Sequence, residues 1–184
     1  MQQSANAQFL AVPPVCRCLL DFGFGAHGLT VMYYRPVDLW DRVQAQDSNV
    51  SFTDFSERNT LRPEVSASSR SDVFSALRSL RVFARHFYND AVQELIDGAS
   101  SFIDSYKGVS DTDAVSWKLL AFWVTSKFSM FRRLIISRDF DAAQEVWLEF
   151  SLTDEEFLEL LDLRRSHHVA DPSHRSPPKT NRAE

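Results

Sequence analysis

One segment, residues 115–136 (VSWKLLAFWVTSKFSMFRRLII), limits what this chain can fold into more than any other. It contains no Gly, Pro, Asp or Glu, and it holds two of the four tryptophans. A run of this length without helix-breaking residues predicts one long helix. Its apolar character predicts that the helix is largely buried and that neighbouring helices pack against it.

The apolar residues of this helix fall into two bands when successive residues are placed about 100° apart. The first band contains Trp117, Leu120, Val124, Phe128, Phe131 and Ile135, and the second contains Leu119, Trp123, Met130 and Leu134. Lys127 falls between the bands, and burial of an unpaired ammonium group is costly. We therefore expect Lys127 to reach solvent along its stem or to meet a carboxylate of residues 139–163. A reactive lysine with a lowered pKa is the alternative.

The composition of the whole chain favours a soluble, mainly helical protein. Apolar residues make up 44% of the 184 residues, which is enough for a core, and five glycines are few for a turn-rich all-β fold. The N-terminus does not resemble a signal peptide, and residues 115–136 carry too many charges for a membrane span. We expect an intracellular protein, cytoplasmic or nuclear.

The sequence divides into five parts by its texture. We expect a disordered N-terminus (residues 1–8), a small strand and helix segment (9–46), a polar linker or long loop (47–68), a helical bundle (69–165) and a disordered basic tail (166–184). The fold class is therefore mainly α, a single bundle of about five helices.

The five helices are predicted from capping residues and from apolar residues at helical spacing. The expected helix-starting pairs are Ser69 with Asp72, Ser110 with Asp113, and Thr153 with Glu156. The expected apolar faces include Phe83 and Phe87 in the first helix, and Phe140, Ala143, Trp147 and Phe150 in the fourth.

The N-terminal segment suggests a β-hairpin. Residues 15–22 and 29–34 resemble two short strands around Gly23-Phe24-Gly25-Ala26-His27-Gly28, and a short helix is expected after Pro36. The glycines match G-x-G-x-x-G, a motif that approaches a pyrophosphate at the start of a helix. Because a strand-like segment follows here, we interpret the glycines as a hairpin loop.

Catalytic and metal-binding patterns are weak in this sequence. Cys16, Cys18 and His27 could supply three zinc ligands, but their spacing is unusual and a fourth ligand is not nearby. There is no G-x-S-x-G or H-E-x-x-H motif, and Glu155 and Glu156 point in different directions on a helix. We therefore expect no metal, no cofactor and no enzymatic activity.

Charge is segregated along the helical part. Residues 114–138 contain five basic residues and no acidic one, whereas residues 139–163 contain nine acidic residues and no basic one. An antiparallel pair of these segments would let the opposite charges neutralise each other.

Two surfaces are candidate partner-binding sites. Phe157, Leu158, Leu160 and Leu161 lie within an acidic run and are typical of a short helix that docks into a groove, or of a helix that faces a core. Arg78, Arg81 and Arg85 form a basic stripe that could pair with acidic residues or contact phosphates.

The resulting hypothesis is a non-enzymatic helical module for protein–protein interaction or assembly. Its protein partner is not identifiable from the sequence, and homo-oligomerisation stays open. The alternative is a nucleic-acid-associated helical packaging protein, similar to a capsid protein, that uses its basic faces and basic tail.

Overall fold

The computed structural model describes residues 15, 22–25, 29–36 and 66–170. The elements in these ranges are η2 (Val31–Tyr34), α3 (Arg70–Phe87), α4 (Asp90–Ser105), α5 (Ala114–Ser137), α6 (Phe140–Glu145), η3 (Val146–Glu149) and α7 (Glu155–Ala170). The protein is mainly α, as predicted, and the described ranges contain five α-helices and no strand. The predictions for residues 1–8, for a helix after Pro36, and for most of the linker (47–68) and of the tail (166–184) concern residues outside the described ranges. Helix α7 continues to Ala170, so residues 166–170, which were predicted to begin the disordered tail, are helical.

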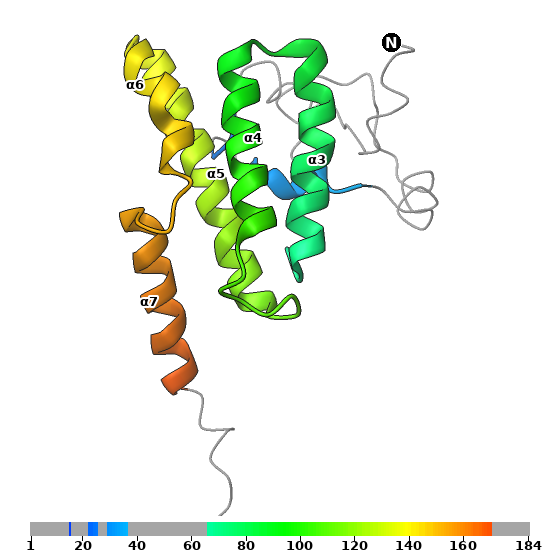
Figure 1. Cartoon of the computed structure of the whole chain (residues 1–184), viewed down its shortest axis with the longest axis vertical. Coiled ribbons are helices and arrows are strands. Elements are labelled where there is room, and N and C mark those ends of the chain that lie inside the picture. Colours follow the sequence, from blue (N-terminus) through cyan, green and yellow to red (C-terminus); the bar gives the residue numbers. More distant parts are fainter. Residues whose placement is uncertain (1–14, 16–21, 26–28, 37–65, 171–184) are drawn as a thin grey trace, which may run out of the picture.

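The helices form a bundle around α5 (Figure 1). Helices α3 and α4 are an antiparallel pair, and α5 lies beside them. The chain reverses after α5 at Arg138, which adopts a left-handed conformation with φ of 63°. Segments α6, η3 and α7 then run back along the outer side of α5, with α6 near its C-terminal end and α7 near its N-terminal end. We call residues 140–163 the arm.

Helix α5 confirms the long, largely buried helix predicted for residues 115–136. Its buried large side chains are Trp117, Leu120, Trp123, Val124, Phe128 and Phe131. Phe128 lies with its ring centroid 5.0 Å from that of Phe24, so the N-terminal part of the chain contributes to the same core. Ile135, which was predicted to continue the first apolar band, is exposed in the last turns of the helix.

Capping residues were predicted with mixed success. Ser69 and Asp72 form the expected capping box at the start of α3. Helix α5 is capped by Asp113 rather than Ser110, and Asp113 accepts a hydrogen bond from the backbone N–H of Ser116. The predicted Thr153 cap of α7 is wrong as well, because the helix begins at Glu155, one residue later than expected, and Asp154 accepts the capping hydrogen bond from the backbone N–H of Phe157.

The strand predicted for residues 29–34 is wrong where the structure describes it. Val31–Tyr34 is a 3-10 helix, and Thr30 caps it by accepting a hydrogen bond from the backbone N–H of Met32. Leu29, Val31 and Met32 are all buried, so the apparent alternation of faces does not exist. Residues 16–21 and 26–28 lie outside the description, and the predicted hairpin partner falls mostly there.

Gly25, within the glycine motif, has a structural explanation. Its φ is 71°, a conformation that favours glycine. A Cβ atom on Gly25 would lie 2.8 Å from the side chain of Ser129 on α5, which is too close for a real contact. The glycine therefore allows the N-terminal segment to approach α5.

Candidate interaction site

Lys127 lies in the middle of α5 and is held by carboxylates of the arm. Its side chain is only 6% exposed. The Nζ atom donates hydrogen bonds to Glu149 at 2.7 Å and to Asp154 at 2.5 Å, and Glu156 lies at 3.6 Å. This confirms the prediction that Lys127 meets a carboxylate of residues 139–163. The opposite charges of α5 and the arm do meet, at one buried point.

Asp154 joins α5 to α7. Its Oδ1 atom accepts hydrogen bonds from Trp123 Nε1 at 2.7 Å and from the backbone N–H of Phe157 at 2.9 Å. The second bond caps α7, because it satisfies one of the free N–H groups in the first helical turn. A single carboxylate therefore binds the lysine and the tryptophan of α5 and also starts α7. We call Lys127, Trp123 and Asp154 the latch.

The pKa values of the latch favour the charged forms. Burial alone would raise the pKa of Asp154, but hydrogen bonds from Lys127, Phe157 and Trp123 outweigh it and hold the pKa below its ordinary value. Burial alone would lower the pKa of Lys127, but the bonds to Asp154 and Glu149 hold it above its ordinary value. A lysine held in the ammonium form is a poor nucleophile, so this direction argues against the reactive-lysine alternative.

The four residues predicted on the acidic helix have different environments. Phe157 is 1% exposed and packs on aromatic rings, with its centroid 5.0 Å from that of Trp123 and 5.3 Å from that of Phe102. Leu160 and Leu161 are half-buried, and Leu158 is exposed. Phe157 thus belongs to the core, and of the four only Leu158 is fully available on the surface.

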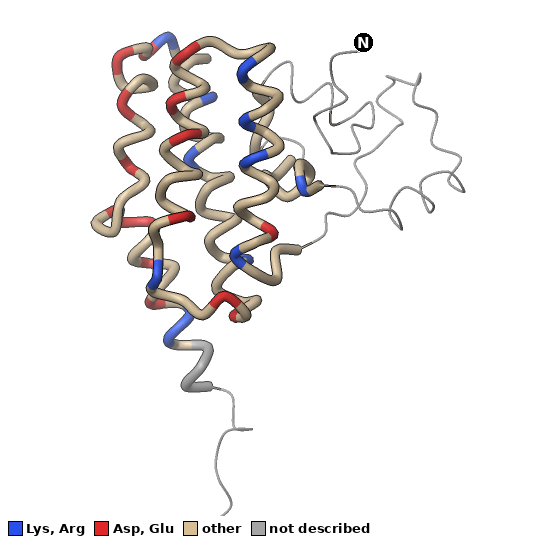
Figure 2. The backbone as a smooth tube through the Cα atoms, turned by 45° about the vertical axis from the view of Figure 1, so that its right-hand side comes forward, with Lys and Arg blue, Asp and Glu red and all other residues tan. Residues whose placement is uncertain are grey.

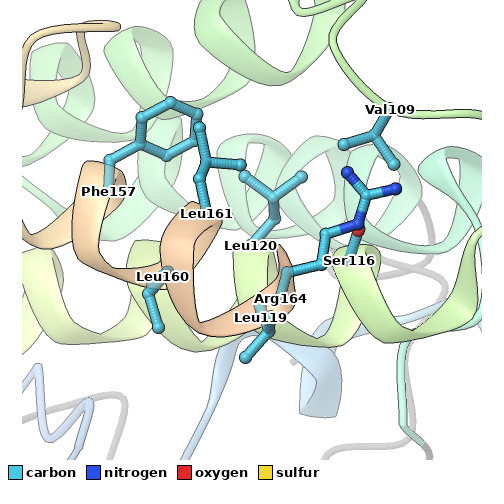
Figure 3. Close-up of a pocket in the computed structure, with 8 residues that line it drawn as sticks. All are labelled: Val109, Ser116, Leu119, Leu120, Phe157, Leu160, Leu161 and Arg164. Atoms are coloured by element: carbon cyan, nitrogen blue, oxygen red, sulfur yellow. The ribbon is translucent and has the colours of Figure 1, made fainter. Parts of the chain in front are cut away.

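A small cavity lies where α7 meets α5 (Figure 3). Leu160, Leu161 and Arg164 of α7 line it from one side, and Ser116, Leu119 and Leu120 of α5 from the other. Arg164 also donates a hydrogen bond to Asp113, the residue that caps α5. The cavity volume is about 10 Å³, which is at the lower limit for one water molecule. It is a packing gap between helices and not a ligand site.

A larger, open groove lies between α4 and η3. Glu94, Asp97, Gly98 and Ser101 of α4 form one wall, and Trp147, Leu148 and Phe150 form the other, around a volume of about 520 Å³. A second hollow of about 500 Å³ is also lined by Phe150, together with Ser105, Lys107 and Leu152. We call the two together the α4–η3 groove.

Gly98 allows η3 to pack closely against α4. A Cβ atom at this position would lie 3.3 Å from both the ring of Phe150 and the carbonyl oxygen of Trp147. The sequence showed only that a glycine weakens the middle of a helix. The structure shows that its missing side chain makes room for the opposite wall of the groove.

Apolar side chains on the surface gather on the arm. Among the described residues, eleven large hydrophobic side chains are exposed, and six of them belong to residues 140–163. These six are Phe140, Trp147, Leu148, Leu152, Leu158 and Leu163. The arm is therefore rich in acidic residues and also carries most of the exposed large apolar side chains among the described residues.

Phe140, Ala143, Trp147 and Phe150 were predicted to share one apolar face, but Phe140, at the start of α6, and Trp147 are exposed. A change of helical pitch accounts for Trp147. The prediction assumed one α-helix over residues 140–150, but the helix becomes 3-10 at Val146. A 3-10 helix turns about 120° per residue instead of 100°. Val146 is consequently buried, and the Trp147 side chain is exposed along the groove. Phe87, also predicted on a core face, is exposed at the end of α3.

The predicted arginine stripe is partly neutralised. Arg81 forms a two-point ion pair with Asp97 of α4, with distances of 2.6 and 2.9 Å. Arg78 and Arg85 are exposed. Figure 2 shows basic positions following one another along α3, and acidic positions along α4 and the segment from α6 to η3.

Metal and membrane sites are not found in the described part of the chain. No three His, Cys, Asp or Glu side chains gather there as metal ligands, and none of its helices combines the length and apolar character needed to cross a membrane. Cys16, Cys18 and His27 lie outside the described residues.

Comparisons of the sequence and the structure with known proteins find no matching family model, curated protein or solved structure. The described residues form an all-helical bundle with the latch in its interior and an open groove. The α4 wall of the groove carries acidic side chains, and the opposite wall carries apolar ones.

Proposed function

We propose that this protein is a non-enzymatic protein-interaction module that binds its partner through the arm and the α4–η3 groove. The observation that carries the proposal is the gathering of exposed apolar side chains on residues 140–163. Exposed apolar surface that is concentrated in one region and bordered by polar groups is typical of a binding site. The exposed Leu158 of the predicted α7 site belongs to the same arm.

The attachment of the arm to α5 suits recognition of a protein. The latch and the buried Phe157 fix the arm on α5, so the exposed side chains are presented on a fixed helical support. Fixed support reduces the loss of conformational entropy when a partner binds. The groove is wide and open rather than deep, which suits a segment of a protein better than a small molecule.

The test is affinity capture with matched surface variants, followed by measurement with purified components. We expect Leu148→Glu combined with Leu152→Glu to reduce capture of a specific protein at least tenfold. The control is Phe122→Glu, which alters an exposed apolar residue of α5 outside the groove. A protein that passes this comparison is then purified and titrated against the same variants. Equal capture by both variants, or equal loss, contradicts the proposal.

Nucleic-acid packaging is a second candidate with less support. It rests on the exposed Arg78 and Arg85, while the third arginine of the stripe is paired with Asp97. Retarded migration of RNA at low salt that is lost with Arg78→Glu and Arg85→Glu would favour this candidate.

A further inference from the structure

The shape of the α4–η3 groove matches a helix. The α4 side chains that line it, Glu94, Asp97, Ser101 and Ser105, follow one another at intervals of three or four residues and so lie on one face of the helix. At the helical rise, residues 94–105 span about 16 Å, or roughly three turns. Trp147 and Phe150 fill the space at Gly98. The small side chains of Ser101 and Ser105 leave the rest of this line open. The groove therefore runs along α4 with the length of a short docked helix.

The wall opposite α4 supplies apolar anchors. Trp147, Leu148 and Leu152 are 43%, 55% and 61% exposed. Helices that dock into grooves place apolar residues at positions i, i+3 or i+4, and i+7 against such side chains. An exposed tryptophan beside two leucines offers the large buried area that dominates binding energy when it is covered.

The charges around the groove determine which net charge a bound partner segment should carry. Helix α4 contains four acidic residues and no Lys or Arg. Residues 139–149 likewise contain four acidic residues and no Lys or Arg. Asp97 is paired with Arg81, but Glu94 forms part of the same wall and is exposed, and one cation, Lys107, lines the far end. Glu149 is paired with Lys127 and Asp104 with Arg70, so the negative charge at the Trp147 end of the groove comes from the exposed Glu94 and Glu145. At this end an acidic segment or a nucleic acid would be repelled, whereas a basic segment would be attracted.

We propose that the α4–η3 groove binds a basic amphipathic helix of a partner protein. The apolar face of that helix covers Trp147, Leu148 and Leu152, and its Lys and Arg side chains meet Glu94 and the neighbouring carboxylates. The proposal rests on the proposed function and specifies the chemistry of the partner segment.

The test uses two labelled synthetic peptides of about five helical turns. Both carry Leu at positions i, i+3, i+4 and i+7. The remaining positions are Lys in the basic peptide and Glu in the acidic peptide. Fluorescence anisotropy with the full chain is expected to show binding of the basic peptide and at least tenfold weaker binding of the acidic one. The affinity for the basic peptide is expected to fall as salt is added.

Three variants locate the binding. Glu94→Lys is expected to weaken binding of the basic peptide about fivefold by introducing repulsion in the groove. Ser101→Trp fills the groove and is expected to abolish binding. The control Asp111→Lys makes the same charge change at an exposed loop residue that does not line the groove, and it is expected to leave the affinity unchanged.

The outcomes separate this inference from its rivals. Equal effects of Glu94→Lys and Asp111→Lys, or unchanged binding by Ser101→Trp, overturn it, because binding is then non-specific or elsewhere. Sedimentation of the chain alone that shows self-association abolished by Ser101→Trp also overturns it, since the occupant is then a second copy. If the Leu148 and Leu152 variant loses a natural partner while neither peptide binds, the interaction module stands and the basic helix is rejected.

Discussion

Helix α5 and the arm form an antiparallel pair, and they differ in how many of their large apolar side chains are buried. Helix α5 buries two tryptophans and two phenylalanines, whereas the arm leaves six large apolar side chains exposed. The difference follows from what holds each element. Helix α5 is surrounded by the other helices and the N-terminal segment, while the arm packs on one side of α5 through the latch and through the buried Ala143, Val146 and Phe157. The arm therefore buries one face and leaves the apolar side chains of its other face exposed.

Ion pairing between helix α5 and the arm is also limited to a small part of their surfaces. Segregation of basic and acidic residues predicted mutual neutralisation, and Lys127 confirms it with carboxylates at 2.5 and 2.7 Å. Lys118 and Arg133, also on α5, are exposed. Neutralisation is concentrated at one buried lysine, so most carboxylates of the arm remain exposed.

The largest expected effect comes from comparing neighbouring residues of the arm. Phe157→Ala should reduce the free energy of unfolding by about 3–5 kcal/mol, because it removes a buried ring that three aromatic rings surround. Leu158→Ala changes an exposed residue and should cost only about 0.5 kcal/mol. Urea unfolding measures both. Similar losses would show that the arm is not anchored through Phe157.

Removing the lysine of the latch should have the next largest effect. Lys127→Met leaves the buried Asp154 carboxylate without its cation and should lower the free energy of unfolding by about 3 kcal/mol. The control Lys118→Met removes an exposed lysine from the same helix and should change it by less than about 0.5 kcal/mol. Thermal and urea unfolding would contradict the role of the latch if the two variants were equally stable.

The smallest of these effects is on the free energy of unfolding at low pH. Since the pKa of Asp154 is lowered in the folded protein, its contribution to stability is complete above the unfolded value of about 3.9 and is lost as the pH falls through the folded pKa. The stability difference between wild type and Asp154→Asn should therefore shrink below about pH 4. In the Lys127→Met background this pH dependence should be weaker. A difference that stays constant down to about pH 2 would reject the latch as its source.

The local signals in the sequence were reliable for the α-helices of the bundle. The absence of helix breakers in residues 115–136 located α5 nearly to its ends, and Ser69 with Asp72 located the start of α3. The strand expected at residues 29–34 is wrong because Val31–Tyr34 is a 3-10 helix in which the adjacent Val31 and Met32 are both buried, so this short apolar run has no true alternation of faces. The groove was missed because it depends on how η3 approaches Gly98, and these lie far apart in the sequence.

The sequence by itself determined the helices and the position of Lys127 between two apolar bands, because helix formation depends on near neighbours. It left open whether Lys127 reaches solvent or meets a carboxylate. Only the tertiary structure decided which carboxylates pair with Lys127 and which apolar side chains are exposed to solvent. Asp154 became both cap and counter-ion because Trp123 and Lys127 meet it from α5. The Trp147 side chain is exposed because the arm changes helical pitch at Val146, and the carbonyl oxygen of Trp147 packs on Gly98.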